Sequence, residues 1–474
     1  MKWKVSIPEK RNIGIIFFIL TTITTNVKAQ IASRDSLATG YLVDAAEEYW
    51  PAHKSITTKQ PFINRIKHLP ISSGSGFVSY GVGLRESYEN YQDYYWGLGP
   101  QDTNGYFLHR ILGHADMYWN QHLRVFGEVE SSFITGRNGG GRPVQDVDKL
   151  AVNQLFGEAH FAVRHQTQVR FRLGKQSLNY GEGTLLDVRD ANVRRSFVGG
   201  KAIVTFRNTR IDAFLMRPIS NREGFFDDQY DTSQLIAGGW MTQNYPHLLK
   251  KLDTYYLFIS RNLTKFNQGV GTETRHTIGT AFHTSQGRWS GYTEANFQLG
   301  QFDDKAIVAW KGAQAVAYEI RELNLKPVIS IQSAISSGDT NPTDNKLQTF
   351  NPIYPKSIYY GFIDNVGSAN VFLIHPKAEF NFSPKLKIVS GYYKFWRQTL
   401  NDGIYAPSGA FLLPANNAGY LIGNMYDVLL NYYYSPFANV QVVVTYFDRG
   451  SYLLDNPALS DDIYYAGIKL FLRL

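Results

Sequence analysis

The chain has 474 residues, no cysteine, a formal net charge of +8 and only 19% charged residues. The absence of cysteine excludes disulfides, a thiolate metal site and a cysteine nucleophile. Aromatic residues make up 15% of the chain. This composition suits a protein with an apolar outer surface, a polar interior and aromatic residues at two membrane interfaces.

Residues 1–29 are predicted to be a secretory signal peptide. Basic residues precede an apolar run at residues 13–20, and the sequence Val27-Lys28-Ala29 provides a cleavage site after Ala29. The apolar run is shorter than the ~20 residues of a membrane-spanning helix. Five basic residues and one acidic residue in this segment account for +4 of the net +8, so the mature chain is only mildly basic.

Residues 30–76 have a different pattern. The stretch 41–50 has the spacing of one short amphipathic helix, and Pro51, Pro61 and Pro70 break up the residues after it. We predict an N-terminal periplasmic segment or a plug of a lumen. A poorly ordered terminus is the alternative.

Residues 77–474 are predicted to form an all-β fold, a transmembrane antiparallel β-barrel. At residues 168–176 apolar and polar side chains alternate with a period of two, and similar alternation recurs at roughly 10-residue length along the chain. The apolar face is expected to contact lipid, and the polar face to line a wet lumen. A soluble β-sandwich would show the same alternation locally, but not such long regular repetition after a signal peptide.

Connection lengths support the barrel. Short turns, such as 207–208 and 383–384, alternate with long polar loops at 136–149, 181–195, 336–358 and 398–419. Outer-membrane barrels have short turns on one rim and long loops on the other. We count about 18 strands, and even numbers are the rule. The alternating stretch 464–474 is expected to pair with the first strand and close the sheet.

Several motifs occur in order along the chain: RFRLGKQSLNYGEG at 170–183, RDANVRRSFVG at 189–199 and SGDTNP at 337–342. From about Val78 onward the chain resembles the alginate export family of outer-membrane porins. The resemblance implies an 18-stranded barrel with an arginine- and lysine-rich path for an anionic uronate polymer. It implies pore-lining roles at the matched positions Arg170, Arg172, Lys175, Arg189, Asp190, Asn192, Arg194 and Arg195.

Alternation alone adds Arg124 and Glu128 to these candidates. Guanidinium groups suit a polyuronate because each planar fork meets a carboxylate with two hydrogen bonds and stays charged. The alternative for each arginine is a bracing role, in which it pairs with an inward carboxylate such as Glu158 and only stiffens the wall.

These observations predict a monomeric channel of the bacterial outer membrane for facilitated diffusion or export of an anionic polysaccharide. The alternative is a general or small-solute porin on the same scaffold. A third possibility is a structural barrel with a plugged lumen, which loops folded inward, such as 336–358, would favour. A periplasmic secretion partner could dock on the barrel, and no nucleic-acid partner is expected.

No catalytic constellation is recognisable in the sequence. It contains no HExxH, GxSxG, Walker or Rossmann pattern, so we predict neither an enzyme nor a cofactor. Asp339, Asn341 and Asp344 have a spacing loosely like that of a calcium loop, but Asx-rich turns also explain it.

Overall fold

The structure is a computed structural model and describes residues 42–48, 50, 66–71, 76–120, 122–140, 143–164, 166–189, 191–415 and 418–474. The signal peptide predicted at 1–29 and most of the segment 30–76 lie outside the described residues, so both assignments stay predictions. Among the described residues, no helix is long and apolar enough to cross a membrane.

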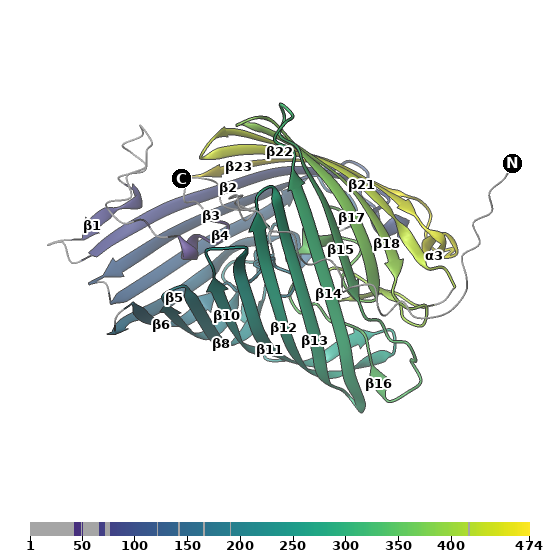
Figure 1. The fold of residues 1–474 in the computed structure, drawn as a ribbon, viewed down its shortest axis with the longest axis horizontal. Coiled ribbons are helices and arrows are strands. Elements are labelled where there is room, and N and C mark those ends of the chain that lie inside the picture. The colour runs from purple at the N-terminus through teal and green to yellow at the C-terminus, as the bar shows by residue number, and fades with distance from the viewer. Residues whose placement is uncertain are drawn as a thin grey trace.

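The described chain forms a closed barrel of 18 antiparallel strands, which confirms the predicted fold class (Figure 1). The barrel strands are β2 (Gly76–Gln92), β3 (Tyr106–Trp119), β4 (Leu123–Thr135), β5 (Asp148–Arg164), β6 (Thr167–Gln176), β7 (Phe197–Phe206), β8 (Thr209–Ser220), β10 (Gln234–Asn244), β11 (Leu249–Phe266), β12 (Gly269–Gln286), β13 (Trp289–Phe302), β14 (Lys305–Glu319), β15 (Val328–Ser336), β17 (Val371–Ser383), β18 (Leu386–Arg397), β21 (Leu421–Ser435), β22 (Ala438–Arg449) and β23 (Ile463–Arg473).

Short elements complete the described chain. They are the strands β1 (Leu69–Ile71), β9 (Gln229–Tyr230), β16 (Lys346–Leu347), β19 (Ile404–Tyr405) and β20 (Phe411–Leu413), the 3-10 helices η1 (Ala45–Glu47), η3 (Tyr94–Gly97) and η4 (Ser357–Tyr360), and the helical turns α2 (Pro143–Asp146) and α3 (Ser451–Leu454).

The alternation in the sequence becomes an alternation in exposure. In β4, Arg124 and Glu128 are 3% and 2% exposed, whereas Leu123 and Val129 are 56% and 45% exposed. Apolar side chains on the outer face of an 18-stranded wall are what lipid requires, because lipid offers no hydrogen bonds. The charged residues of the same strands therefore point into the barrel.

The barrel closes where its first and last long strands meet. Strand β23 pairs antiparallel with β2, from Gly83 opposite Arg473 to Gln92 opposite Tyr464, and the two lie side by side in Figure 1. Strand β1 covers the start of β2, with Leu69 opposite Val78. Backbone groups along this seam are thus paired, as a sheet in lipid requires.

The two rims differ as the sequence predicts, except at two connections. Turns such as 207–208, 384–385 and 436–437 are short and lie on one rim. On the opposite rim the connections 267–268 and 303–304 are also short. There the strands themselves are long, since β11 and β12 have 18 residues each.

Three long connections fold into the barrel and contact one another. The loop 177–196 meets the loop 337–370 at an isolated bridge between Leu186 and Tyr354. The loop 398–420 meets 337–370 where Asp402 Oδ2 accepts from the Asp339 backbone N–H at 2.9 Å. The long connections of this chain therefore narrow the lumen as well as covering one rim.

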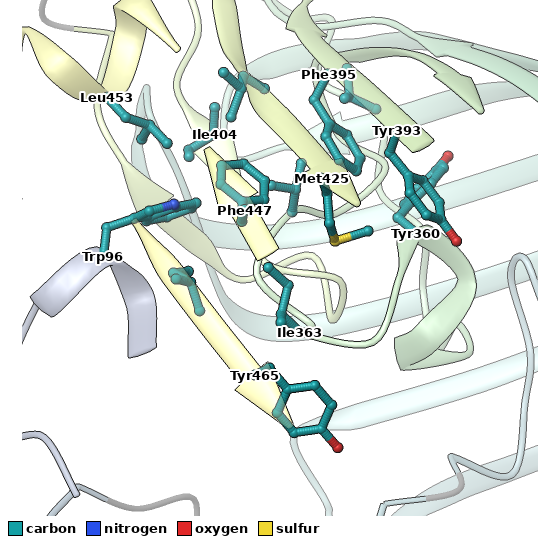
Figure 2. Close-up of a cluster of buried hydrophobic side chains, with 14 of the residues drawn as sticks. Trp96, Tyr360, Ile363, Tyr393, Phe395, Ile404, Met425, Phe447, Leu453 and Tyr465 are labelled. Carbon is teal, nitrogen blue, oxygen red and sulfur yellow. The ribbon is translucent and has the colours of Figure 1, made fainter. Parts of the chain in front are cut away.

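An apolar core fills one side of the barrel interior, although lumens of such barrels are generally polar. Figure 2 shows Trp96 of η3 close to Phe447 of β22, with ring centroids 5.5 Å apart. Tyr360 of the loop 337–370 and Ile404 of the loop 398–420 belong to the same cluster. The inward loops are held in place by hydrophobic burial against the wall.

Candidate functional site

A dense group of charges lies on the wall formed by β4 to β8. Strand register places Arg124 opposite Glu158, Glu158 opposite Arg172, and Arg172 opposite Lys201, on four consecutive strands. Directly opposed residues on neighbouring strands have Cβ atoms about 5 Å apart. The fold therefore builds one row of interacting charges from residues as far apart in the sequence as Arg124 and Lys201.

Glu158 is the centre of this row. Arg172 Nε donates to its Oε2 at 2.7 Å, and His160 Nε2 lies 2.7 Å from its Oε1. Arg170 and Arg124 reach the same carboxylate at 3.5 and 3.8 Å. One buried carboxylate thus fixes the orientations of several cationic side chains.

Arg124 also pairs with a second carboxylate. Its Nε and Nη2 donate to the two oxygens of Asp116 at 2.7 and 2.9 Å, a bidentate arrangement. Both side chains are buried. This contact has the geometry of the bracing alternative, since two donors of the planar fork bind one carboxylate of the wall.

A short N-terminal segment, residues 42–48, lies against this wall. Glu47 of η1 accepts from Arg172 Nη1 and from Arg210 Nη1, both at 3.3 Å. Burial raises the pKa of Glu47, but the cations Arg172, Lys201 and Arg210 outweigh it and hold this pKa well below its usual range. Glu47 is therefore charged under ordinary conditions.

The backbone of the same segment is bound too. Arg124 Nη2 donates to the carbonyl of Ala46 at 2.6 Å, and Arg194 Nη1 donates to that of Val43 at 2.7 Å. Ala46 packs with Phe126 and Phe156 of the wall. Basic and aromatic side chains of the barrel thus hold a piece of its own chain inside the lumen.

The inward loop 177–196 is anchored through Asn192, which is 1% exposed. Its Nδ2 donates to the carbonyls of His109, Phe133 and Asp146 at 3.1, 3.2 and 2.8 Å. Its Oδ1 accepts from Arg85 Nη2 at 3.1 Å. Asn192 therefore fastens the loop to β2, β3 and β4.

The arginines of this loop have different environments. Arg189 donates to the carbonyl of Val193, and Arg194 donates its backbone N–H to Glu130 Oε1 at 3.1 Å. Arg195 lies over the ring of Tyr354, 5.0 Å from its centroid. Burial and the neighbouring Arg189 lower the pKa of Arg195 to about 9.

The structure places most of the residues predicted from the sequence inside the barrel, but not all of them. Those on the inner wall or on the inward loop are Arg124, Glu128, Arg170, Arg172, Arg189, Asn192, Arg194 and Arg195. Asp190 lies outside the described residues. Glu128 accepts from Asn153 Nδ2 at 2.6 Å and so belongs to a buried polar network.

Lys175 occupies a different place from the other candidates. In register it stands opposite Leu155, whose side chain is on the outer face, and it shares the parity of Phe171 and Leu173. Its Nζ lies 3.0 Å from Asp228 Oδ2 in the loop 221–233. Lys175 is therefore not on the face of β6 that carries Arg170 and Arg172, because successive residues of a strand point to opposite faces. Its ammonium group contacts the loop 221–233 instead.

Sequence reasoning missed Lys201 and Arg210, the two cations that complete the surroundings of Glu47. Lys201 stands in a glycine- and alanine-rich strand, where polar and apolar residues alternate weakly. Arg210 and Asp212 alternate with Ile211 and Ala213 in β8, a signal that the period of two could have found.

Charged side chains on the opposite wall also bind an inward loop. Arg275 Nε lies 2.6 Å from Glu273 Oε1, and Arg275 Nη1 donates to the carbonyl of Thr349 at 3.0 Å. Asn351 Nδ2 donates to Glu273 at 3.0 and 3.1 Å. These contacts hold the loop 337–370 against β12.

A closed barrel with an apolar exterior and a charged interior crossed by loops defines an outer-membrane channel. A sequence model of the alginate export family matches residues 77–461, and the chain belongs to that family. This membership confirms the resemblance seen in the sequence and, with the barrel, places the protein in the bacterial outer membrane. None of the curated protein sequences compared with the chain matches it.

Solved structures share the fold at low sequence identity. OccAB1 of Acinetobacter baumannii has a TM-score of 0.57 and 11% identity, covering 86% of this chain and 99% of its own. OccD3 (OpdP) of Pseudomonas aeruginosa has a TM-score of 0.56 and 10% identity, covering 86% and 93%. OpdK of the same species, solved with vanillate, has a TM-score of 0.55 and 10% identity, covering 84% and 98%.

Proposed function

We propose that this channel passes an anionic saccharide, such as a uronate oligomer, along the basic wall formed by β4 to β8. The observation that carries the proposal is the position of Glu47, whose carboxylate lies 3.3 Å from both Arg172 and Arg210. A wall that holds a carboxylate of its own chain has the chemistry to hold that of a sugar acid. A monomeric state is part of this proposal.

Movement past the site requires binding that is weak enough to reverse. Bonds of 3.3 Å are longer than the ~2.8 Å of a strong charge-assisted hydrogen bond. Arg170, whose side chain is 22% exposed on the same wall, offers a carboxylate a further partner beyond Arg210. Such a series allows conduction, because no single site holds the solute too tightly to leave.

A second candidate, a channel for small organic acids, is favoured by the inward loops. The loops 177–196, 337–370 and 398–420 contact one another inside the barrel, and an apolar cluster fills one side. This narrowing favours a small solute over a polymer. The structure of OpdK with vanillate is an example of a similar barrel solved with such a molecule.

Ion selectivity and blockade test both candidates. The purified protein is refolded into a planar bilayer under a salt gradient, and the reversal potential is recorded with and without an oligouronate or a monomeric uronate. We expect anion selectivity that Arg170→Glu with Arg172→Glu abolishes. The matched control is Arg288→Glu with Arg321→Glu on the short-turn rim, which changes the net charge equally outside the lumen.

The outcomes separate the candidates. Blockade by the oligouronate supports the saccharide conduit, whereas blockade by the monomer alone supports the small-acid channel. A cation-selective channel, or one indifferent to the wall substitutions, contradicts both and leaves a general porin.

A further inference from the structure

The segment 42–48 carries three carboxylates, and two of them, on Asp44 and Glu48, are buried. Asp44 Oδ1 accepts from Gln154 Nε2 of the wall at 2.9 Å. Asp44 Oδ1 accepts from the Ala46 backbone N–H at 3.0 Å and so caps η1. Glu48 accepts from the Leu42 backbone N–H and from Trp50 Nε1, both at 2.9 Å. Within the described parts of the chain, the side-chain hydrogen bonds and ion pairs of Glu47 go only to Arg172 and Arg210.

The Glu47 carboxylate is shared between strands. Its Oε1 faces Arg172 of β6 and its Oε2 faces Arg210 of β8, while Lys201 lies on β7 between them. Three cations from three adjacent strands surround one acidic group. Two of the groups remain open to the lumen, because the Glu47 and Arg210 side chains are 29% and 37% exposed. A dissolved anion can therefore reach this place.

The remaining contacts of the segment follow the same chemistry. Guanidinium groups of Arg124 and Arg194 donate to its carbonyl oxygens, and Ala46 packs on Phe126 and Phe156. A sugar acid offers matching features: a carboxylate, oxygen acceptors and an apolar ring face. The segment thus uses the contacts that such a solute would need.

We propose that residues 42–48 are a tethered competitor, in which Glu47 occupies the position of a solute carboxylate between Arg172, Lys201 and Arg210. An anionic solute enters by displacing this carboxylate, and the segment returns when the solute leaves. The identity of the solute rests on the function proposed above. The displacement itself requires only an anion that competes for the three cations.

The cysteine-free chain allows a direct test in the full-length protein. Glu47→Cys removes the carboxylate and with it the contacts to Arg172 and Arg210 that hold the segment in the lumen. We expect the open fraction of single channels to rise by at least about tenfold, the effect of losing one charge-assisted contact. A sulfonate-bearing methanethiosulfonate reagent then restores a negative charge and returns the channel toward its original closure. A trimethylammonium-bearing reagent of similar size leaves it open. Glu47→Gln gives the opening result without a thiol.

The matched control is Glu322→Cys, which removes a carboxylate from an exposed ion pair with Arg288 on the short-turn rim. Neither reagent should change its conductance. The proposal of a tethered competitor would be contradicted by equal responses of the Glu47→Cys channel to both reagents. It would also be contradicted if neither Glu47 variant opened the channel. If charge at position 47 gates the channel but no uronate blocks it, the tethered competitor is supported and the proposed saccharide channel is contradicted.

Discussion

At the scale of single residues, the arginines of the lumen lie in two different environments. Arg124 is bidentate to Asp116, with both partners buried, and its Nη2 also donates to the carbonyl of Ala46, so its donors bind groups of the protein itself. Arg210 keeps 37% of its side chain exposed and pairs with both Asp212 and Glu47. A buried arginine whose donors are all bonded needs no function beyond a structural one. An exposed arginine can bind a solute if its carboxylate partner, here Glu47, moves away.

Glu158→Gln should shift the charge of the wall without removing a cation. It weakens the hydrogen bond from Arg172 and leaves Arg170 and His160 without their shared carboxylate. We expect stronger anion selectivity and a loss of roughly 3 kcal/mol in the free energy of unfolding, as for a broken buried pair. Reversal potentials and urea unfolding in detergent measure the two effects.

The control for this substitution is Glu319→Gln, which removes a carboxylate from the partly exposed pair with Arg321. Exposed pairs contribute less than about 1 kcal/mol, so stability and selectivity should stay close to those of the parent protein. Equal effects of the two substitutions would show that Glu158 contributes no more to selectivity and stability than an exposed carboxylate.

At the scale of elements, Asn351 connects the loop 337–370 to the barrel wall. Its Nδ2 donates to both oxygens of Glu273, and its backbone N–H donates to Gln298 Oε1 at 3.0 Å. Asn351→Ala removes the side-chain bonds and leaves a buried carboxylate short of donors, which costs about 2 kcal/mol. We expect a looser loop and a larger single-channel conductance.

Asn341→Ala in the same loop is the matched comparison. Asn341 is exposed and its side chain accepts from Thr343, within a turn rather than across the lumen. Its removal should leave conductance unchanged. An equal rise in both variants would mean that the loop does not restrict the channel.

The strands could be predicted from the sequence, and the paths of the loops could not. Lipid outside and polar groups inside impose a period of two on each strand, so Leu123 and Arg124 already indicate opposite faces. Leu186, Phe350 and Ile353 are almost fully buried in the inward loops, but no period marks them. Their burial depends on contacts between distant loops, which local patterning does not encode.

The candidate site could likewise be predicted only in part: its single residues could, but their convergence could not. Arg170 and Arg172 follow from alternation in one strand, and Arg124 from another. The convergence of Arg172, Lys201 and Arg210 on Glu47 depends on strand register and on the path of the N-terminal segment. Register is fixed by the whole closed sheet, so this convergence becomes visible only in three dimensions.

At the scale of the whole molecule, we expect the contact between two inward loops to make conductance depend on pH. Asp339 lies where 337–370 meets 398–420. Burial, together with the nearby Asp402 and Asp344, raises its pKa to about 6 against the opposing effect of Lys305. The backbone N–H of Asn341 donates to Asp339 Oδ1 at 3.1 Å, as in an Asx turn.

The sign of this dependence comes from linkage. The folded pKa lies above the unfolded value of 3.8, so the folded loop binds more protons and gains stability as pH falls through about 6. Charge on Asp339 loosens the loop contact above that pH. We therefore expect single-channel conductance to decrease severalfold from pH 8 to pH 5. Asp339→Asn mimics the protonated form and should remain at the low conductance across the range, whereas an unchanged pH profile in this variant would assign the titration to another group.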